Sequence, residues 1–189
     1  MDREQKMIEG ILNILCDRHI FKREDAAELE KQFRRSEIER FEDYLIDEDL
    51  VDKSDLLAAL KQYYNVPAID VMGESFDHDL LTKFPQDVLL RNCCIPYRQD
   101  GPLLFMIAAD PTDENLDEIL GKFVSYDFEY FVGIPRHIDM MIKDFYQKEM
   151  YKEDFEDIVD EEARERDTVH IDEYDDQLIH LDEEGKEDE

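Results

Sequence analysis

Two short acidic segments carry residue types that could perform acid–base or metal chemistry. In one, His78 stands between Asp77 and Asp79, and in the other, residues 110–113 begin and end with aspartate. Carboxylates beside an imidazole can ligate a metal or transfer protons. Aspartate also caps helices and initiates turns, which needs no catalysis. We interpret Asp77 as a helix cap and residues 110–113 as a turn followed by a cap.

Catalytic motifs of other kinds are missing from the sequence. None of the six glycines stands in the Gly-x-x-x-x-Gly-Lys-Ser/Thr loop that cradles nucleotide phosphates. Neither a Gly-x-Ser-x-Gly nor a His-Glu-x-x-His segment occurs, and the five histidines form no metal-ligand grouping. We therefore predict no enzyme, with no catalytic residues, no metal site and no cofactor.

The charge of the chain restricts its partners. The 189 residues include 52 acidic and 22 basic side chains, for a formal net charge of −30. Residues 149–189 alone carry 20 acidic and 4 basic side chains. Such a field repels nucleic acids and anionic membrane surfaces, so we expect neither as a partner. A basic protein partner and a merely solubilising surface both fit the acidic segment.

The cysteines and the N-terminus favour a cytoplasmic location. Cys16, Cys93 and Cys94 are odd in number and two are adjacent, which does not describe a disulfide framework. The N-terminus lacks the apolar core of a signal peptide, and no apolar run approaches the ~20 residues that span a bilayer. We expect buried free thiols in a reducing compartment and no direct membrane insertion.

The first 65 residues predict a helical subdomain. Residues 3–35 carry an apolar stripe at helical spacing, with a break at residues 19–21. Residues 37–64 repeat this plan, with a turn at residues 49–51 and Ser54 as the expected cap of the next helix. The sequence therefore predicts two helical hairpins of about 25 residues each, which form an internal repeat of the same helical arrangement.

Residues 66–148 predict an α/β subdomain around one central strand. Leu103 to Ala109 is a continuous apolar run, typical of a strand covered on both faces, and it pairs with residues 95–98 as a hairpin. A helix over 113–124, a half-buried strand over 127–132 and a final helix follow. The predicted class is α+β: helical hairpins, then a small α/β sandwich with a three- to four-stranded sheet. Residues 149–189 are expected to form an acidic helix extension and a disordered tail.

Six landmarks follow one another in the chain at sensible spacing. They are Ala58 to Pro67 after a helical hairpin, Ile69-Asp70, Leu80 to Pro85, Cys94 to Tyr97, Ala108 to Asp113, and Gly133 to Ile138 before a helix that ends in Phe145-Tyr146. Together they resemble the N-terminal domain of the type II secretion and type IV pilus assembly ATPases (the GspE/PilB/MshE-type domain). The resemblance covers roughly residues 5–148.

In that family the domain has a helical part and an α/β part, precedes the motor and docks on inner-membrane platform components. One branch binds cyclic di-GMP through two tandem motifs in the helical part. The resemblance implies Arg40, Leu45 and Leu50 as the nucleotide-binding residues of the second motif, if the ligand binds. Two motif glycines are replaced here by Glu42 and Asp49, which add bulk and negative charge where backbone N–H groups approach phosphate.

The glutamine of that motif is Tyr63, and the first hairpin fits less well, with Gly10 in place of the arginine. We therefore expect cyclic di-GMP to be an unlikely ligand. The expected function is a stand-alone protein–protein interaction module that lacks the motor, with a secretion, pilus or regulatory component as partner. Expected docking residues are Tyr63, Tyr64, Phe145 and Tyr146, although ordinary core packing is the favoured interpretation of these side chains. A degenerate cyclic di-GMP sensor and a piece of a longer ATPase stay open, although the acidic C-terminus favours a natural end.

Overall fold

The structure is a computed structural model, and it describes residues 3–149. Residues 1–146 form one compact unit, to which the elements below belong, and a second unit begins at Gln147. The expected helix extension and disordered tail beyond residue 149 lie outside the described residues. Within residues 3–149, no helix is long and apolar enough to cross a bilayer.

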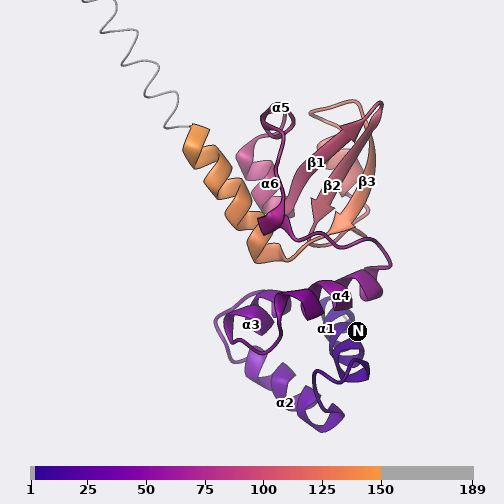
Figure 1. The fold of residues 1–189 in the computed structure, drawn as a ribbon, viewed down its shortest axis with the longest axis vertical. Coiled ribbons are helices and arrows are strands. Elements are labelled where there is room, and N and C mark those ends of the chain that lie inside the picture. The colour runs from indigo at the N-terminus through magenta and orange to yellow at the C-terminus, as the bar shows by residue number, and fades with distance from the viewer. Residues whose placement is uncertain (1–2, 150–189) are drawn as a thin grey trace, which may run out of the picture. The chain divides into compact units, whose positions relative to one another are not determined.

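Four helices occupy the first third of the chain (Figure 1). They are α1 (Arg3–Asp17), α2 (Arg23–Phe33), α3 (Phe41–Asp47) and α4 (Lys53–Tyr64). The apolar stripe of α1 is buried as its spacing predicts, at Ile8, Ile11, Leu12 and Leu15. Because α1 contributes this stripe to a cluster shared with α2, α3 and α4, the four helices have a common core.

Both helical hairpins turn through the same backbone device. After α1, His19 is left-handed (φ 63°), and after α3, Asp49 is left-handed (φ 52°). The N–H of the next residue then donates to a carbonyl five residues back, Ile20 to Leu15 at 2.9 Å and Leu50 to Leu45 at 3.0 Å. Such a cap satisfies carbonyls that the helix end leaves free.

Two expected helix boundaries are wrong. Ser54 lies inside α4, whose N-cap is Asp52, so the chain enters the helix two residues earlier than predicted. The helix predicted over 113–124 is only α7 (Leu116–Leu120). It ends because Gly121, a poor helix former, stands at its C-cap, and Phe123 is therefore left 41% exposed.

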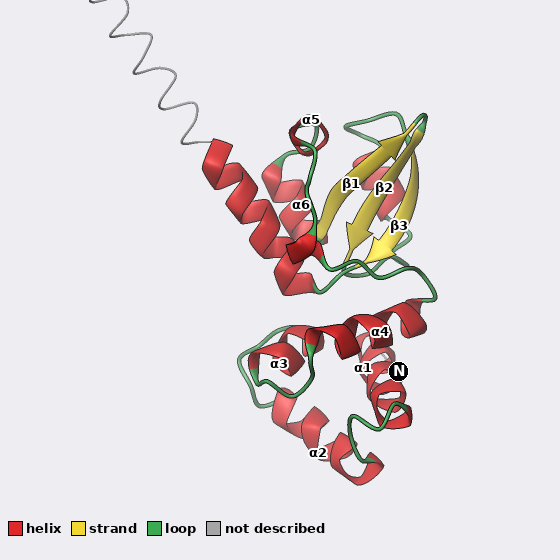
Figure 2. Cartoon of the chain, in the orientation of Figure 1, coloured by secondary structure: helices red, strands yellow, loops and turns green. Residues whose placement is uncertain are grey.

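The sheet has three strands, β1 (Cys94–Asp100), β2 (Leu103–Ala108) and β3 (Asp127–Val132), in the order β1-β2-β3 (Figure 2). β1 and β2 form the predicted antiparallel hairpin, which turns at Gly101 with φ 57°. β3 lies parallel to β2 on its other side, and one bridge from Ala68 pairs with Val132 at the outer edge. β2 is thus the central strand, as its apolar run predicts.

Short helices precede and follow the sheet. A 3-10 turn, η1 (Val71–Gly73), leads to α5 (His78–Leu81) and α6 (Gln86–Asn92). Residues 135–149 form the final helix, which buries Ile138 and Ile142 against the sheet cluster. Val132, the last residue of β3, and Ile134 just after it instead pack into the cluster of the four N-terminal helices. Apolar contacts therefore join the two parts of the chain, whose boundary at residue 65 stays a prediction.

Candidate functional site

The two acidic segments that opened the sequence argument serve as local structure. Asp77 accepts a hydrogen bond from the Asp79 N–H at 2.8 Å and so caps α5, as predicted. His78 lies against the Phe145 ring, with centroids 5.4 Å apart. Asp110 accepts from the N–H and hydroxyl of Thr112 at 3.0 and 2.7 Å, which confirms the turn. Within residues 3–149, no three His, Cys, Asp or Glu side chains group as metal ligands.

A pocket of about 410 Å³ lies where the N-terminal helices meet the segment after β2. Residues from α1, α3, α4, the loop after β2 and the start of the final helix line it. Its lining is of two kinds, aromatic and charged. A concave surface with such mixed chemistry is typical of binding sites.

The aromatic wall of the pocket comes from α3 and α4. Tyr63 and Tyr64 are half-buried neighbours in an edge-to-face contact, with ring centroids 4.8 Å apart. Phe41 completes this wall and is 1% exposed. Tyr63 also lies over Gly10 of α1, where an added Cβ would meet the ring Cε2 at 2.3 Å. The missing side chain at Gly10 is what allows α1 and this ring to approach.

Glu42, in the first turn of α3, is a charged residue that the fold buries. It is 4% exposed and lines the pocket. Burial raises the pKa of its carboxyl to about 7, since a carboxylate loses hydration there, and its own backbone N–H only partly offsets this. The neighbouring Asp43 and Asp110 carboxylates raise the pKa further, while Arg40 lowers it. Glu42 is therefore half protonated near neutral pH.

Both arginines of the pocket are already engaged. Arg40 donates to Asp139 of the final helix at 2.8 Å and lies 3.5 Å from the Cys93 sulfur. Arg3 pairs with Asp110 at 2.9 Å and donates to Thr112 at the same distance. The guanidinium groups thus tie the N-terminal helices to the segments around the sheet.

A second set of contacts, made by Arg136, also joins α3 to the final helix. The Arg136 N–H donates to Asp43 at 2.9 Å, and the Arg136 side chain forms an ion pair with Asp47. Burial raises the pKa of Asp43, although its bond from Arg136 and its proximity to Arg40 act in the opposite direction. Pairs of opposite charges therefore hold the start of the final helix against α3.

Three of the predicted site residues meet at the pocket, and four do not. Arg40, Tyr63 and Tyr64 line it. Leu45 is fully buried in the helical core and Leu50 is half-buried against it. Phe145 and Tyr146 are not among the lining residues and instead pack beside α5.

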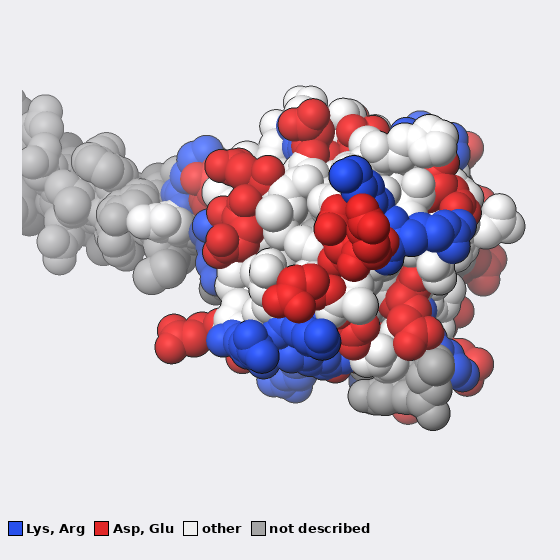
Figure 3. All heavy atoms as spheres, turned by 90° about the horizontal axis from the view of Figure 1, so that it is seen from below, with Lys and Arg blue, Asp and Glu red and all other residues white. Residues whose placement is uncertain are grey.

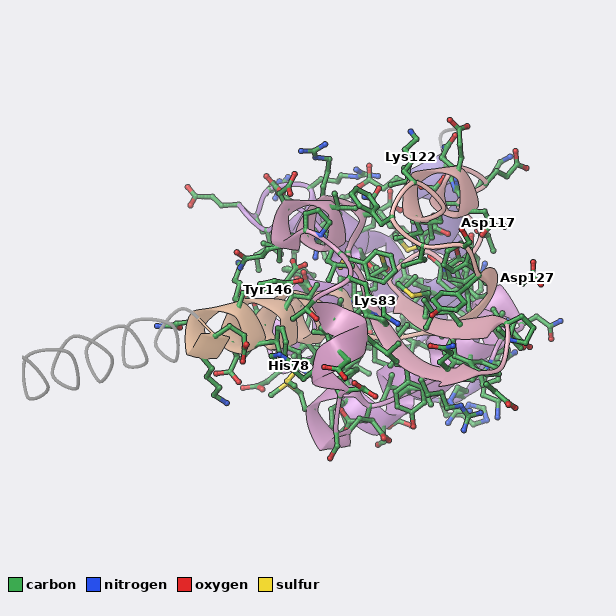
Figure 4. All side chains as sticks on the ribbon, turned by 90° about the horizontal axis from the view of Figure 1, so that it is seen from above. His78, Lys83, Asp117, Lys122, Asp127 and Tyr146 are labelled. Atoms are coloured by element: carbon green, nitrogen blue, oxygen red, sulfur yellow. The ribbon has the colours of Figure 1, made fainter. Side chains whose placement is uncertain are left out.

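Tyr146 is held there by its hydroxyl, which donates to the carbonyls of Leu81 and Phe84 at 2.9 and 2.5 Å. Figure 4 labels Tyr146 on the final helix and His78 on the neighbouring α5. Tyr146 is therefore half-buried and hydrogen-bonded beside α5, and its role in docking stays a prediction. The sequence argument also missed Arg3 and Asp110 as pocket residues, because no motif relates positions so far apart.

The charges on the face that carries α2 are interspersed. Figure 3 shows acidic and basic side chains alternating over this face rather than gathering into one basic patch. Exposed pairs such as Arg34–Glu4 at 3.0 Å and Arg23–Asp17 account for part of this pattern. This face lacks the continuous positive stripe that nucleic-acid backbones select.

Comparisons with known proteins confirm the resemblance seen in the sequence. Residues 64–151 match the MshEN domain. The type IV pilus assembly ATPase PilB of Myxococcus xanthus (strain DK1622) is 26% identical over 134 residues, which are 68% of this chain and 23% of PilB. The chain thus matches less than a quarter of that relative's length.

Two solved structures share the fold. MshE with cdg (cyclic di-GMP) aligns with a TM-score of 0.56 and 20% identity, over 72% of this chain and 98% of that one. The N-terminal domain of XpsE aligns with a TM-score of 0.52 and 18% identity, over 72% and 94%. The chain is therefore similar, in sequence and in fold, to the N-terminal domains of secretion and pilus ATPases. The expectation that cyclic di-GMP is an unlikely ligand gains no support, because MshE is seen with that nucleotide.

Proposed function

We propose that this chain, as a relative of the N-terminal domains of secretion and pilus ATPases, is a non-catalytic module that docks a protein partner. The observation that carries the proposal is the pocket, whose half-buried Tyr63 and Tyr64 present ring surface beside charged groups. Tyrosine is enriched at protein interfaces because its ring is apolar and its hydroxyl is polar. The proposal includes a cytosolic location, which the free, buried thiols Cys16, Cys93 and Cys94 support.

The test is affinity capture by the full chain from cells that contain it, compared with a Tyr64→Ala variant. The free energy of unfolding of the variant is measured first, so that only a folded variant is compared. We expect one protein to be retained by the chain and lost with the variant. If every captured protein is retained equally by both, the pocket is not a docking surface.

A second candidate function is cyclic di-GMP sensing, favoured by the likeness to MshE with that ligand. The left-handed corners at His19 and Asp49 keep the backbone form that glycine adopts most easily. Two features oppose the nucleotide: Arg40 is held by Asp139, and Glu42 places a carboxyl in the pocket. Each phosphate charge would have to displace or outweigh these groups.

Isothermal titration with cyclic di-GMP decides between the candidates. Titrations of the full chain and of Glu42→Gly at pH 6 and pH 8 separate ligand affinity from the effect of the carboxyl. Binding heat at micromolar cyclic di-GMP in the unchanged chain would identify the chain as a sensor. Heat in Glu42→Gly alone would show that this side chain blocks the site, and no heat in either would leave the docking module.

A further inference from the structure

We infer that the pocket receives one basic side chain, an arginine or lysine presented by the protein partner. This inference rests on the proposed docking function and names the chemistry of the group that is docked. Three features of the pocket favour a cation: the charge of its lining, the state of Glu42, and the aromatic wall.

The charge of the lining favours a cation. Among the lining residues, the acidic side chains are Glu4, Glu39, Glu42 and Asp110, and the basic ones are Arg3 and Arg40. Arg3 is paired with Asp110, Arg40 with Asp139 and Glu4 with Arg34, so these charges are largely used within the chain. Glu39 and Glu42 are the charged lining residues outside these pairs, and both are acidic. An anionic ligand is repelled and a cationic one is attracted.

Glu42 is the group that a cation would satisfy. Glu42 is 4% exposed, and within residues 3–149 the compensation of its charge is limited to a hydrogen bond from its own backbone N–H and the proximity of Arg40. A buried carboxylate with so little compensation takes up a proton more readily, as the raised pKa of Glu42 indicates. A guanidinium or ammonium placed beside it would restore the charged form, because opposite charges attract strongly where water is excluded.

The aromatic wall suits the same ligand. Cations lie favourably over the faces of tyrosine and phenylalanine, and guanidinium does so most often. Tyr63, Tyr64 and Phe41 supply rings within the pocket that holds Glu42. A volume of about 410 Å³ falls at the small end of ligand sites, so one side chain fits rather than a helix.

A blocked peptide, acetyl-Gly-Arg-Gly-amide, is the probe, and its citrulline counterpart is the neutral control of nearly equal shape. Each is titrated into the full ¹⁵N-labelled chain, and backbone amide shifts are followed by NMR. We expect the arginine peptide to shift amides at Glu42, Tyr63 and Tyr64, and the citrulline peptide to shift none of them. Equal effects of the two peptides, or shifts confined to other surfaces, would overturn the inference.

The affinity should also depend on pH. Because Glu42 has a pKa of about 7 and binds the cation only when charged, we expect about tenfold tighter binding at pH 8 than at pH 6. No histidine is among the residues that line the pocket. The titratable and charged groups that face Glu42 are Arg3, Glu4, Glu39, Arg40, Asp43, Tyr63, Tyr64 and Asp110.

Variants complete the test. Glu42→Gln keeps the side-chain shape and removes the charge, so we expect at least tenfold weaker binding and no pH dependence. Glu48→Gln, at the exposed end of the same helix, should leave both unchanged. Unchanged affinity in Glu42→Gln would refute the cation site. If the arginine peptide fails while Tyr64-dependent capture of a protein persists, the docking function stands and this inference falls.

Discussion

The two helical hairpins of this chain share a backbone and differ in chemistry. At each corner a left-handed residue, His19 or Asp49, lets the following N–H reach the carbonyl of Leu15 or Leu45. Leu15 and Leu45 are both fully buried in one core. Neither corner uses glycine, so residues that tolerate the left-handed region suffice for this turn.

The difference lies nine residues before each corner. In the first hairpin Gly10 offers no side chain, and the Tyr63 ring occupies the space. In the second, Arg40 extends to Asp139 of the final helix. One hairpin thus shapes the aromatic wall of the pocket, and the other joins the helices to the sheet. A repeat can keep its packing while each copy acquires its own contact.

The largest expected effect tests what the hairpins share. Leu15→Ala and Leu45→Ala should each lower the free energy of unfolding by about 3 kcal/mol, because both remove a fully buried side chain from the same core. Urea unfolding measures this. A loss at Leu45 below about 1 kcal/mol, with Leu15 at the full value, would show that only the first hairpin is tightly packed.

The next effect tests what the second hairpin has gained. Arg40→Ala should lower the free energy of unfolding by about 2 kcal/mol, since it removes a charge-assisted hydrogen bond and leaves Asp139 partly buried without it. Arg23→Ala, which breaks an exposed pair with Asp17, should cost below about 1 kcal/mol. A double-mutant cycle with Asp139→Ala isolates the pair, and a coupling near zero would contradict this role.

A somewhat smaller effect belongs to the first hairpin. Gly10→Ala should lower the free energy of unfolding by about 1 kcal/mol, because displacement of the Tyr63 ring outweighs the gain in helix propensity. The mutation should also move the NMR signals of Tyr63 and Tyr64 in the pocket wall. A stabilised Gly10→Ala variant with unchanged tyrosine signals would mean that the contact is loose.

The smallest effect concerns the corners. His19→Gly and Asp49→Gly should each raise the free energy of unfolding by up to about 1 kcal/mol, because relief of the left-handed backbone outweighs the added freedom of the unfolded chain. Asp49 should gain more, since its carboxylate lies at the negative end of α3. Thermal unfolding at pH 7 compares them, and a destabilised Asp49→Gly would show that its side chain is needed there.

The elements that periodicity governs could be predicted from the sequence. The stripe along α1 and the apolar run of β2 follow from burial of one helix face and of both strand faces. The ends of helices were harder to predict where several capping or helix-ending residues lie close together. Ser54 has the chemistry of a cap, but Asp52 stands at the N-cap position, and Gly121 ended α7 before its apolar pattern did.

The pocket could be predicted only in part. Arg40 was found through the resemblance, the tyrosines as an aromatic-rich helix end, and Glu42 only as a departure from the family motif. Glu42 is buried in a pocket that residues of α4 and of the loop after β2 also line, and local sequence does not encode such meetings of distant segments. The pairing of Arg40 with Asp139 likewise joins residues that are distant in the chain, and neither has a local signal for the other.

The mixed sheet also bears on the order in which the chain folds. β1 and β2 are joined by a tight turn at Gly101, so their pairing closes a short loop and can form on the microsecond timescale of hairpins. β3 follows β2 in the chain only after α7, so the β2–β3 pairing joins residues that are farther apart in the sequence. The bridge between Ala68 and Val132 joins residues separated by most of the α/β segment. Pairings between distant residues form slowly. We therefore expect the β1–β2 hairpin to be an early kinetic unit and the outer edge at Ala68 to close last.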